Sequence, residues 1–401
     1  MTDAVIVAAA RSPFGKAFRG SLASVRPDDL TETVVRAAMS RVPGLDPSTL
    51  DDLFVGCAVP SDEHGDNIAR RVAIQLGYDD VPGVTVNRFC ASSVQTTRMA
   101  LHAIRAGEGR AFISAGVDCV SRYRTPVDDS RNPRFAAAME RSAAFTASGE
   151  VWTDPRTEGL LPDVYIDMGQ TAEHVAVLRG VSRERQDEYA LRSQQRAIEA
   201  LDAGYFDTEI VPITLADGTV VTTDDGPRRD STIERMASLS PVFRAEGTVT
   251  AANACPLNDG AAALVVMSSD YAHELGITPL ARIVATSSTS LSPEIMGLGP
   301  VSAIRALLSA RGMSARDIDL FEINEAFAAQ VLPSIDDLGL DEARVNVHGG
   351  AIAIGHPFGA TGARLLGTLI NGLTRRDETF GVASMCVAGG QGMALLLERI
   401  S

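Results

Sequence analysis

The segment DDLFVG at residues 51–56 returns near the end of the chain as DIDLFE at residues 317–322. Two further pairs of segments follow in the same order, residues 84–87 with 345–347 and residues 111–116 with 379–384. The members of each pair lie roughly 260 to 270 positions apart, and self-similarity at a fixed offset is the signature of a repeated structural unit. The sequence therefore predicts two copies of one β/α unit.

The residue pattern around these segments indicates the architecture of the unit. Short, continuous apolar runs such as residues 4–9 and 261–267 suit strands that are buried on both faces, and amphipathic helices such as residues 31–39 and 302–308 alternate with them. This alternation predicts layered α/β lobes. Between the two copies, from about residue 122 to residue 249, lies a region with polar loops and a long charged helix expected at 182–203, with Ser182 as its N-cap. We interpret this region as an insertion that covers the functional site.

Composition excludes several classes of protein. The chain has 401 residues, of which 45% are hydrophobic and 22% charged, as is normal for a soluble protein of two or three lobes. Its formal net charge of -15 argues against nucleic-acid or anionic-membrane partners. The N-terminus lacks the features of a signal peptide, and no stretch reaches the roughly 18 uncharged apolar residues that a membrane span requires. The five cysteines lack short paired spacing, which argues against a disulfide framework or a metal site and favours reduced thiols in the cytoplasm.

Two of the cysteines lie in contexts typical of reactive thiols. Cys90 follows a β-like run and precedes a helical one, and a helix N-terminus is expected to lower the pKa of its thiol. Small neighbours such as Ala91 and Ser92 leave backbone N–H groups free to bind an oxyanion. Cys386 ends an apolar strand and precedes a glycine turn at residues 389–390. For each cysteine the alternative is a packing residue without chemistry.

A histidine and an asparagine complete the candidate set. His356 lies in the glycine-rich and proline-rich turn at residues 349–359, and its imidazole could take a proton from a thiol. His348, eight residues upstream, is its main competitor, and an ordinary turn histidine is the alternative. Asn324 could orient a water toward a carbonyl oxygen. Two thiols and an imidazole in these contexts predict covalent acyl transfer with a separate proton-transfer step.

Together these segments resemble the thiolase family. The motifs are Asn-Arg-x-Cys-x-Ser at 87–92, Asn-Glu-Ala-Phe-Ala at 324–328, Gly-Gly-Ala-Ile-Ala-x-Gly-His-Pro-x-Gly at 349–359, and a final cysteine before a glycine turn. The resemblance extends from residue 4 to residue 399. It implies the thiolase fold, in which two similar βαβαβαββ halves form a five-layered α/β/α/β/α core with an inserted loop domain. The expected boundaries are 1–121 with 250–271 for the N-terminal half, 122–249 for the loop domain and 272–401 for the C-terminal half.

The resemblance also implies roles for individual residues. Cys90 would carry the acyl group as a thioester, His356 would activate Cys90, and Cys386 would move the proton to and from the α-carbon of acetyl-CoA. One oxyanion hole would use His356 and a water held by Asn324. The backbone N–H groups of Cys90 and Ala388 would form a second one.

Further residues are expected to contact the substrate. By the same resemblance the CoA-binding positions are Arg228, Met168, Cys255 and Phe327. Four departures from the family pattern stand out: alanine at 388 where many members have glycine, Cys255-Pro256 in place of Ser-Gly, Asp167 in place of histidine, and His348 in place of asparagine. The changes at Cys255 and Asp167 weaken an assignment to acetoacetyl-CoA chemistry.

The implied activity is that of a degradative 3-ketoacyl-CoA thiolase, an acetyl-CoA C-acyltransferase of fatty-acid β-oxidation with ping-pong kinetics. Two alternatives stay open: a short-chain acetoacetyl-CoA thiolase that works in the condensing direction, and a non-catalytic CoA-binding subunit. A β-ketoacyl synthase shares the fold type, but retention of Cys386 argues against it. Coenzyme A and acyl-CoA are expected as substrates rather than as permanently bound cofactors. A homodimer or homotetramer, with a possible β-oxidation partner, is implied as well.

Overall fold

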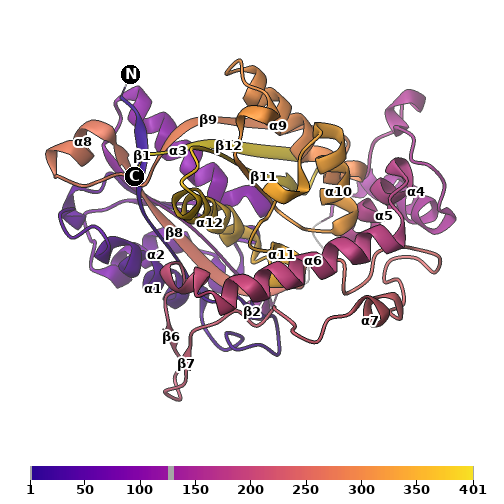
Figure 1. The fold of residues 1–401 in the computed structure, drawn as a ribbon, viewed down its shortest axis with the longest axis horizontal. Helices are drawn as coiled ribbons and strands as arrows, with labels where there is room; N and C mark the ends of the chain where they lie inside the picture. The colour runs from indigo at the N-terminus through magenta and orange to yellow at the C-terminus, as the bar shows by residue number, and fades with distance from the viewer. Residues whose placement is uncertain (1, 125–130, 401) are drawn as a thin grey trace.

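Both predicted repeats form β-sheets. The structure is a computed structural model that describes residues 2–124 and 131–400 (Figure 1). The strands of the first half are β1 (Ala4–Arg11), β2 (Gly15–Lys16), β3 (Asp52–Gly56), β4 (Gly83–Val86), β5 (Ala111–Cys119) and β8 (Asn258–Ser268). The strands of the second half are β9 (Ala281–Ser290), β10 (Leu320–Ile323), β11 (Phe380–Val387) and β12 (Gln391–Arg399). The strands predicted at 4–9 and 261–267 are confirmed as β1 and β8.

The two halves share one strand topology, which confirms the repeat. In the first half β3 lies parallel to β5, β5 pairs antiparallel with β8, and β8 pairs antiparallel with β1. In the second half β10 lies parallel to β11, β11 pairs antiparallel with β12, and β12 pairs antiparallel with β9. The second pair of repeated segments, residues 84–87 and 345–347, is less complete, because β4 pairs with β3 whereas Val345 makes only an isolated bridge to Phe321. A two-residue pairing of β1 with β9 joins the halves into one ten-stranded sheet within the described residues.

Helices lie on both sides of each sheet. Those of the two halves are α1 (Pro27–Ser40), α2 (Ile68–Leu76), α3 (Ser92–Ala106), α8 (Ser269–Glu274), α9 (Gly299–Ser309), α10 (Ala328–Leu338), α11 (Ala351–Ile354) and α12 (Phe358–Arg376). The helices predicted at 31–39 and 302–308 lie within α1 and α9. Helix α12 begins directly after Pro357, which occupies its N-cap position.

Helices and sheets form the five expected layers in the order helices, sheet, helices, sheet, helices. Three apolar cores fill the space between these layers, and the middle core lies on both sides of the central helices. The first core packs α1 and α2 on one face of the β1–β3–β5–β8 sheet. The second packs α3 and α12 between that sheet and the sheet of the second half. The third packs α9 and α10 on the outer face of the second sheet. The alternation along β8 shows the cause, because Leu264 and Val266 face the central core while Val265 and Met267 face the outer one.

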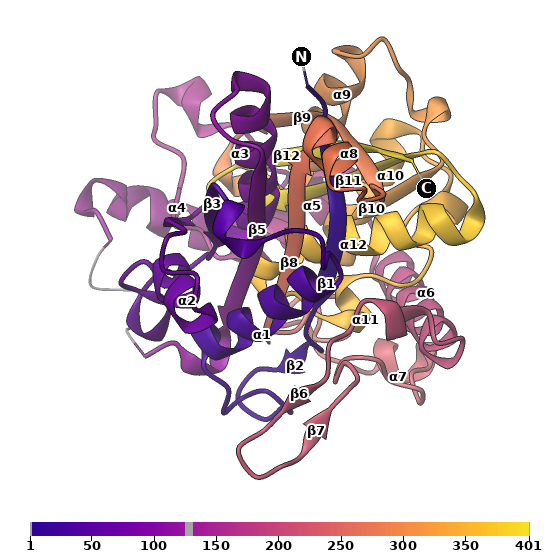
Figure 2. The same cartoon turned by 90° about the vertical axis from the view of Figure 1, so that its left-hand side faces the viewer.

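The region between the halves is helical rather than a simple loop. It contains α4 (Ala136–Ser148), α5 (Met168–Arg179), α6 (Arg183–Asp202), β6 (Ile213–Thr214), β7 (Val220–Val221) and α7 (Ile233–Ala237). The predicted charged helix is confirmed as α6, and the Ser182 hydroxyl accepts the Arg185 N–H at 3.3 Å as its cap. Both α5 and α6 pack against α10, and the β6–β7 hairpin projects from the body of the protein (Figures 1 and 2).

The predicted domain boundaries stay a prediction, and residues 1, 125–130 and 401 lie outside the described chain. Among the residues that the structure describes, no helix combines the length and the apolarity needed to cross a membrane.

Candidate active site

Cys90 lies in a tight turn between β4 and α3. The turn, Phe89–Ala91, is a single 3-10 turn, and Phe89 adopts a left-handed backbone with φ of 46°. The Ser92 hydroxyl accepts the Arg88 N–H at 2.9 Å and donates to the Phe89 carbonyl at 2.6 Å, which locks the turn. The predicted position of Cys90 at the N-terminal end of a helix is therefore confirmed, and its side chain is partly exposed.

The electrostatics of Cys90 differ from the expectation. The backbone N–H groups of Cys90 and Ala388 lie close enough to the sulfur to lower its pKa. Burial, followed by the nearby Asp118 carboxylate, outweighs them and raises the pKa of Cys90 to about 12. The prediction of a lowered thiol pKa was wrong, because desolvation penalises the thiolate more than the helix terminus favours it. At neutral pH the thiol keeps its proton and needs a base to remove it.

The turn after Cys386 brings a second thiol to the same place. Burial, followed by the Cys90 and Cys255 thiols, raises the pKa of Cys386, so these three cysteines are neighbours in space. Gly389 and Gly390 have φ of 75° and 77°, whereas Ala388 is not among the residues with positive φ. The strained positions of the turn are therefore glycines, and alanine at 388 keeps its N–H without backbone strain.

His356 is held by a chain of hydrogen bonds. Its Nδ1 lies 2.7 Å from the Thr361 hydroxyl, which itself donates to the Pro357 carbonyl at 2.8 Å. Thr361 therefore accepts from Nδ1–H, and this assigns the lone pair to Nε2. The Asn324 amide Nδ2 lies 3.3 Å from that Nε2. Burial, followed by the Arg364 charge, lowers the pKa of His356 to about 3, so the imidazole is neutral and able to accept a proton.

The competing histidine lies elsewhere. His348 stacks on Tyr205 with ring centroids 3.6 Å apart, and burial followed by arginines 376, 375 and 196 lowers its pKa to about 4. The backbone N–H of His356, by contrast, donates to Asn258 Oδ1 at 2.9 Å, which ties the second-half turn to the first half. The structure thus places His356, and not His348, with Asn324.

Three of the four expected substrate contacts lie beside the thiols. Met168, Phe327 and Cys386 belong to one apolar cluster. The Cys255 N–H donates to the Ala326 carbonyl at 3.0 Å, directly before Phe327. Phe243, which the sequence did not indicate, packs edge-on against Phe327 with centroids 6.3 Å apart.

Arg228 lies at the surface of a loop that packs on the His356 segment. Its backbone N–H donates to Gln194 Oε1 at 2.8 Å, while its side chain is exposed. Two residues earlier, a Cβ on Gly226 would lie only 2.0 Å from the Ala353 carbonyl of α11, so the loop approaches that helix closely. Burial, followed by the Arg228 charge, lowers the pKa of Lys16, which places a second cation nearby.

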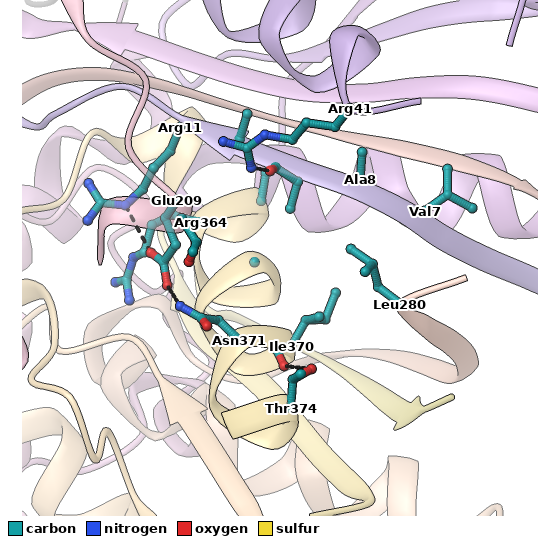
Figure 3. A pocket seen from close by; sticks show the side chains of 15 residues that line it. Val7, Ala8, Arg11, Arg41, Glu209, Leu280, Arg364, Ile370, Asn371 and Thr374 are labelled. Carbon is teal, nitrogen blue, oxygen red and sulfur yellow. Dashed lines mark hydrogen bonds and ion pairs between the residues drawn. The ribbon is translucent and has the colours of Figure 1, made fainter. Parts of the chain in front are cut away.

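A separate cavity of about 550 Å³ lies between β1 and α12 (Figure 3). Arg11, Arg41 and Glu209 line it together with apolar side chains such as Leu280 and Ile370. None of the predicted site residues lines this cavity. The Asn324 N–H instead donates to the Ser384 carbonyl at 2.9 Å, which places Asn324 and its partner His356 near Cys386 and the other two thiols.

Comparison with known families decides the class of protein. Residues 4–270 match the family described as "Thiolase, N-terminal domain", and residues 277–399 match "Thiolase, C-terminal domain". The chain belongs to the thiolase family. Thiolases are acyltransferases that use CoA substrates, and the resemblance inferred from the sequence is confirmed.

Relatives with several activities match the whole chain. It is 41% identical to a Bacillus subtilis 3-ketoacyl-CoA thiolase, with 99% of this chain and 100% of the relative covered. It is 43% identical to a Pseudomonas aeruginosa beta-ketoadipyl-CoA thiolase, with 99% of each covered. Among solved structures, Bacillus anthracis acetyl-CoA acetyltransferase has a TM-score of 0.88 at 39% identity. The match covers 100% of this chain and 99% of that chain. Human mitochondrial 3-ketoacyl-CoA thiolase in complex with CoA has a TM-score of 0.86 at 35% identity. This match covers 100% of this chain and 98% of that chain.

Several residues of this thiolase site were missed by the sequence reasoning. The Glu325 carboxylate accepts hydrogen bonds from the Tyr189 hydroxyl at 2.9 Å, the Ser193 hydroxyl at 2.7 Å and the Ile352 N–H at 3.2 Å, and it thereby ties α6 to the turn before His356. Glu325 lies inside a motif already singled out, next to Asn324. Its role depends on partners far away in sequence, so the motif alone did not reveal it.

Gln391 links the two cysteine turns. Its Nε2 donates to the Ala388 carbonyl at 3.2 Å, and its Oε1 accepts from Arg88 Nη1 at 3.0 Å. Because Arg88 precedes Cys90 by two residues, this bridge sets the Cys386 turn against the Cys90 turn. Only the pairing of the two halves brings these side chains together.

Proposed function

We propose that this thiolase cleaves 3-ketoacyl-CoA to acetyl-CoA and a shortened acyl-CoA through a thioester on Cys90. The observation that carries the proposal is the surroundings of the Cys90 sulfur, where the backbone N–H groups of Cys90 and Ala388 lie close enough to lower its pKa. Two donors at a nucleophile can stabilise the oxyanion of a tetrahedral intermediate. The thiol of Cys386 lies beside that sulfur, where a leaving carbanion needs a proton.

The first half-reaction forms the acyl-enzyme. His356 Nε2 takes the Cys90 proton, and the thiolate attacks the 3-keto carbon of the substrate. The C2–C3 bond then breaks, and its electron pair stays on C2 as the enolate of acetyl-CoA. Cys386 gives its proton to C2, which releases acetyl-CoA and leaves Cys386 as a thiolate.

The second half-reaction restores the enzyme. The thiol of free CoA gives its proton to the Cys386 thiolate and attacks the carbonyl carbon on Cys90. The Cys90–carbon bond breaks, and the Cys90 thiolate regains its proton from the His356 imidazolium. Both proton carriers end as they began, so the cycle balances and requires no resident cofactor group.

Asn324 and the substrate-binding residues have supporting roles in this proposal. The Asn324 amide oxygen is buried without a hydrogen-bond partner among the described residues, which suits a bound water near His356 Nε2. That water and the imidazolium would stabilise the enolate oxygen. Met168, Cys255 and Phe327 would contact the pantetheine arm, and the exposed Arg228 would contact a CoA phosphate.

The test is CoA-dependent cleavage of a 3-ketoacyl-CoA series from acetoacetyl-CoA to 3-ketohexadecanoyl-CoA, with 3-ketoadipyl-CoA included because relatives carry that name. Cys90→Ala serves as the control. A maximum at longer chains that disappears in Cys90→Ala supports a degradative enzyme of β-oxidation. Activity on acetoacetyl-CoA alone would assign the short-chain class. No turnover of any member, together with slow and uniform alkylation of the cysteines, would contradict the proposal and favour a non-catalytic CoA-binding subunit.

A further inference from the structure

A buried carboxylate close to Cys90 has no part in the proposed reaction. Asp118, near the end of β5, is fully buried and accepts four hydrogen bonds from three segments of the chain. Its Oδ1 accepts from Cys57 Sγ at 3.4 Å and from the Tyr123 hydroxyl at 2.6 Å. Its Oδ2 accepts from the Ala58 N–H at 3.0 Å and from the Gly359 N–H at 2.5 Å. Because both oxygens accept two hydrogen bonds each, the carboxylate is held in one position.

The bond to Gly359 caps the helix that follows His356. Pro357, at the N-cap of α12, offers no side-chain acceptor, so the first N–H groups of the helix need a partner from elsewhere. Asp118 supplies it from the other half of the protein, and the helix dipole favours a carboxylate there. Thr361, in the same first turn, holds the His356 ring. The position of Asp118 therefore sets the position of the imidazole.

The bond to Ala58 leads to the nucleophile. The Ala58 carbonyl accepts from Asn87 Nδ2 at 3.0 Å, and Asn87 Oδ1 accepts the Phe89 N–H at 2.8 Å. Phe89 is the left-handed residue directly before Cys90. One chain of hydrogen bonds thus runs from the α12 cap through Asp118 to the Cys90 turn.

Close packing leaves this junction little freedom. A Cβ on Gly359 would lie 2.6 Å from the Gly56 carbonyl and 2.7 Å from the Val117 carbonyl. A Cβ on Gly116 would lie 2.0 Å from the Gly359 carbonyl. The backbones of β3, β5 and α12 are therefore in contact where Asp118 joins them.

The charge of Asp118 also acts on Cys90. The titratable groups around Asp118 are Cys57, His64, Cys119 and Tyr123, and those around the Cys90 sulfur are Asp118, Cys255 and Cys386. The proposed base His356 is neutral, because burial lowers its pKa to about 3. Burial raises the pKa of each of these cysteines and of Tyr123, and it lowers that of His64, so all of them are uncharged at neutral pH. Asp118 is then the charge that opposes the Cys90 thiolate.

We propose that Asp118 is a positioning residue of the acyl-transfer site, which clamps the His356 turn to the Cys90 turn and keeps the Cys90 thiol protonated until a base removes its proton. The turnover part of this proposal rests on the proposed function, whereas the part about the thiol does not. The test therefore measures both turnover and the pH dependence of Cys90 alkylation by iodoacetamide.

Asp118→Asn removes the charge and one acceptor oxygen. Its kcat should fall roughly 10- to 100-fold with little change in KM, because about 1 Å of misplacement costs about 100-fold in rate. The pH midpoint of Cys90 alkylation should shift downward, because a neutral amide no longer opposes the thiolate. General destabilisation would also expose the thiol and lower its midpoint, so the comparison uses Asp118→Asn protein whose urea unfolding matches that of the wild type. Asp118→Glu, which keeps the charge, should keep the raised midpoint.

The matched control is Asp28→Asn, which removes another buried carboxylate, on the outer helix α1. Asp28 is 4% exposed and forms an ion pair with Arg26. It should change neither kcat nor the alkylation midpoint. A wild-type midpoint together with a kcat within twofold of wild type in Asp118→Asn would overturn the proposal. A shifted midpoint in a protein that turns over no 3-ketoacyl-CoA would instead contradict the proposed function and support only the effect of Asp118 on the Cys90 thiol.

Tyr123→Phe keeps the proposal testable if Asp118→Asn does not fold. Loss of the Tyr123 hydroxyl leaves the Asp118 charge less neutralised, so the alkylation midpoint should move upward, opposite to Asp118→Asn. A midpoint that stays unchanged or moves downward in Tyr123→Phe would show that Asp118 does not control the thiol.

Discussion

At the scale of a residue, Ala388 shows what the proposed oxyanion site requires. The position must present a backbone N–H to the Cys90 sulfur, and it does so from an ordinary backbone conformation. Gly390 carries the steric constraint, because a Cβ there would lie 2.3 Å from the Leu291 carbonyl. Many family members have glycine at the position of Ala388, yet the chemistry needs only the N–H.

Substitutions at Ala388 should separate the N–H from the side chain. Ala388→Gly keeps the donor and should keep kcat within a few-fold of wild type. Ala388→Pro removes the donor and should lower kcat about 100- to 1000-fold, the usual effect of losing one oxyanion donor. Steady-state kinetics on the best 3-ketoacyl-CoA substrate measures both. Equal activities of the two variants would contradict the assignment of this N–H.

At the scale of an element, α12 connects the central core to the catalytic turn. Its middle packs between the two sheets. Its first turn forms hydrogen bonds with His356 through Thr361 and with Asp118 through Gly359. Two of its glycines meet different surroundings. A Cβ on Gly359 would press into backbone carbonyls, whereas a Cβ on Gly367 would lie 3.4 Å from the Ala9 Cβ, at ordinary contact distance.

The two alanine substitutions on this helix should have opposite effects. Gly359→Ala forces backbone apart and should lower the free energy of unfolding by about 1–3 kcal/mol. It should also reduce kcat, because the His356 turn shifts with the helix. Gly367→Ala should raise the free energy of unfolding by about 0.5–1 kcal/mol through lower chain entropy, without loss of activity. Urea unfolding and kinetics of both variants test this, and a stable, fully active Gly359→Ala would show that the junction is loose.

At the scale of the whole molecule, the site exists only where the two halves meet. Cys90 and Asn258 come from the first half, whereas Asn324, His356 and Cys386 come from the second. The outer edge of the sheet has a different character. Strand β4 ends the described sheet with one edge unpaired, and Val84 on it is exposed beside the exposed Phe89. Unpaired edges of this kind favour pairing with a second chain.

We therefore expect the protein to self-associate through β4. Light scattering after size-exclusion chromatography should give a mass of at least twice the 42.3 kDa of the chain. Val84→Asp places a charge on that edge and should shift the distribution toward the monomer, whereas Val220→Asp, at an exposed position of the β6–β7 hairpin, should not. A monomeric wild-type protein, or equal masses for all three, would contradict this interface.

The sequence alone revealed a large part of this organisation. Local sequence patterns predicted the repeat and the alternation of buried strands with amphipathic helices. They also predicted the turns that carry Cys90, His356 and Cys386, because a turn depends on neighbouring residues of the chain. Glycines and a proline around His356 already indicated a turn that presents a side chain. Asn324 could also be identified from its neighbours, because it lies in the motif Asn-Glu-Ala-Phe-Ala.

Only the tertiary structure decided how these groups behave. The raised pKa of Cys90, the neutrality of His356 and the exclusion of His348 follow from burial and from charges contributed by other elements. Asp118, Glu325 and Phe243 gain their contacts from segments up to 241 residues away in the sequence. Desolvation and Coulomb interactions depend on distance in space rather than on position along the chain, so the sequence determined which groups are candidates for the site, and the fold determined their protonation states and their partners.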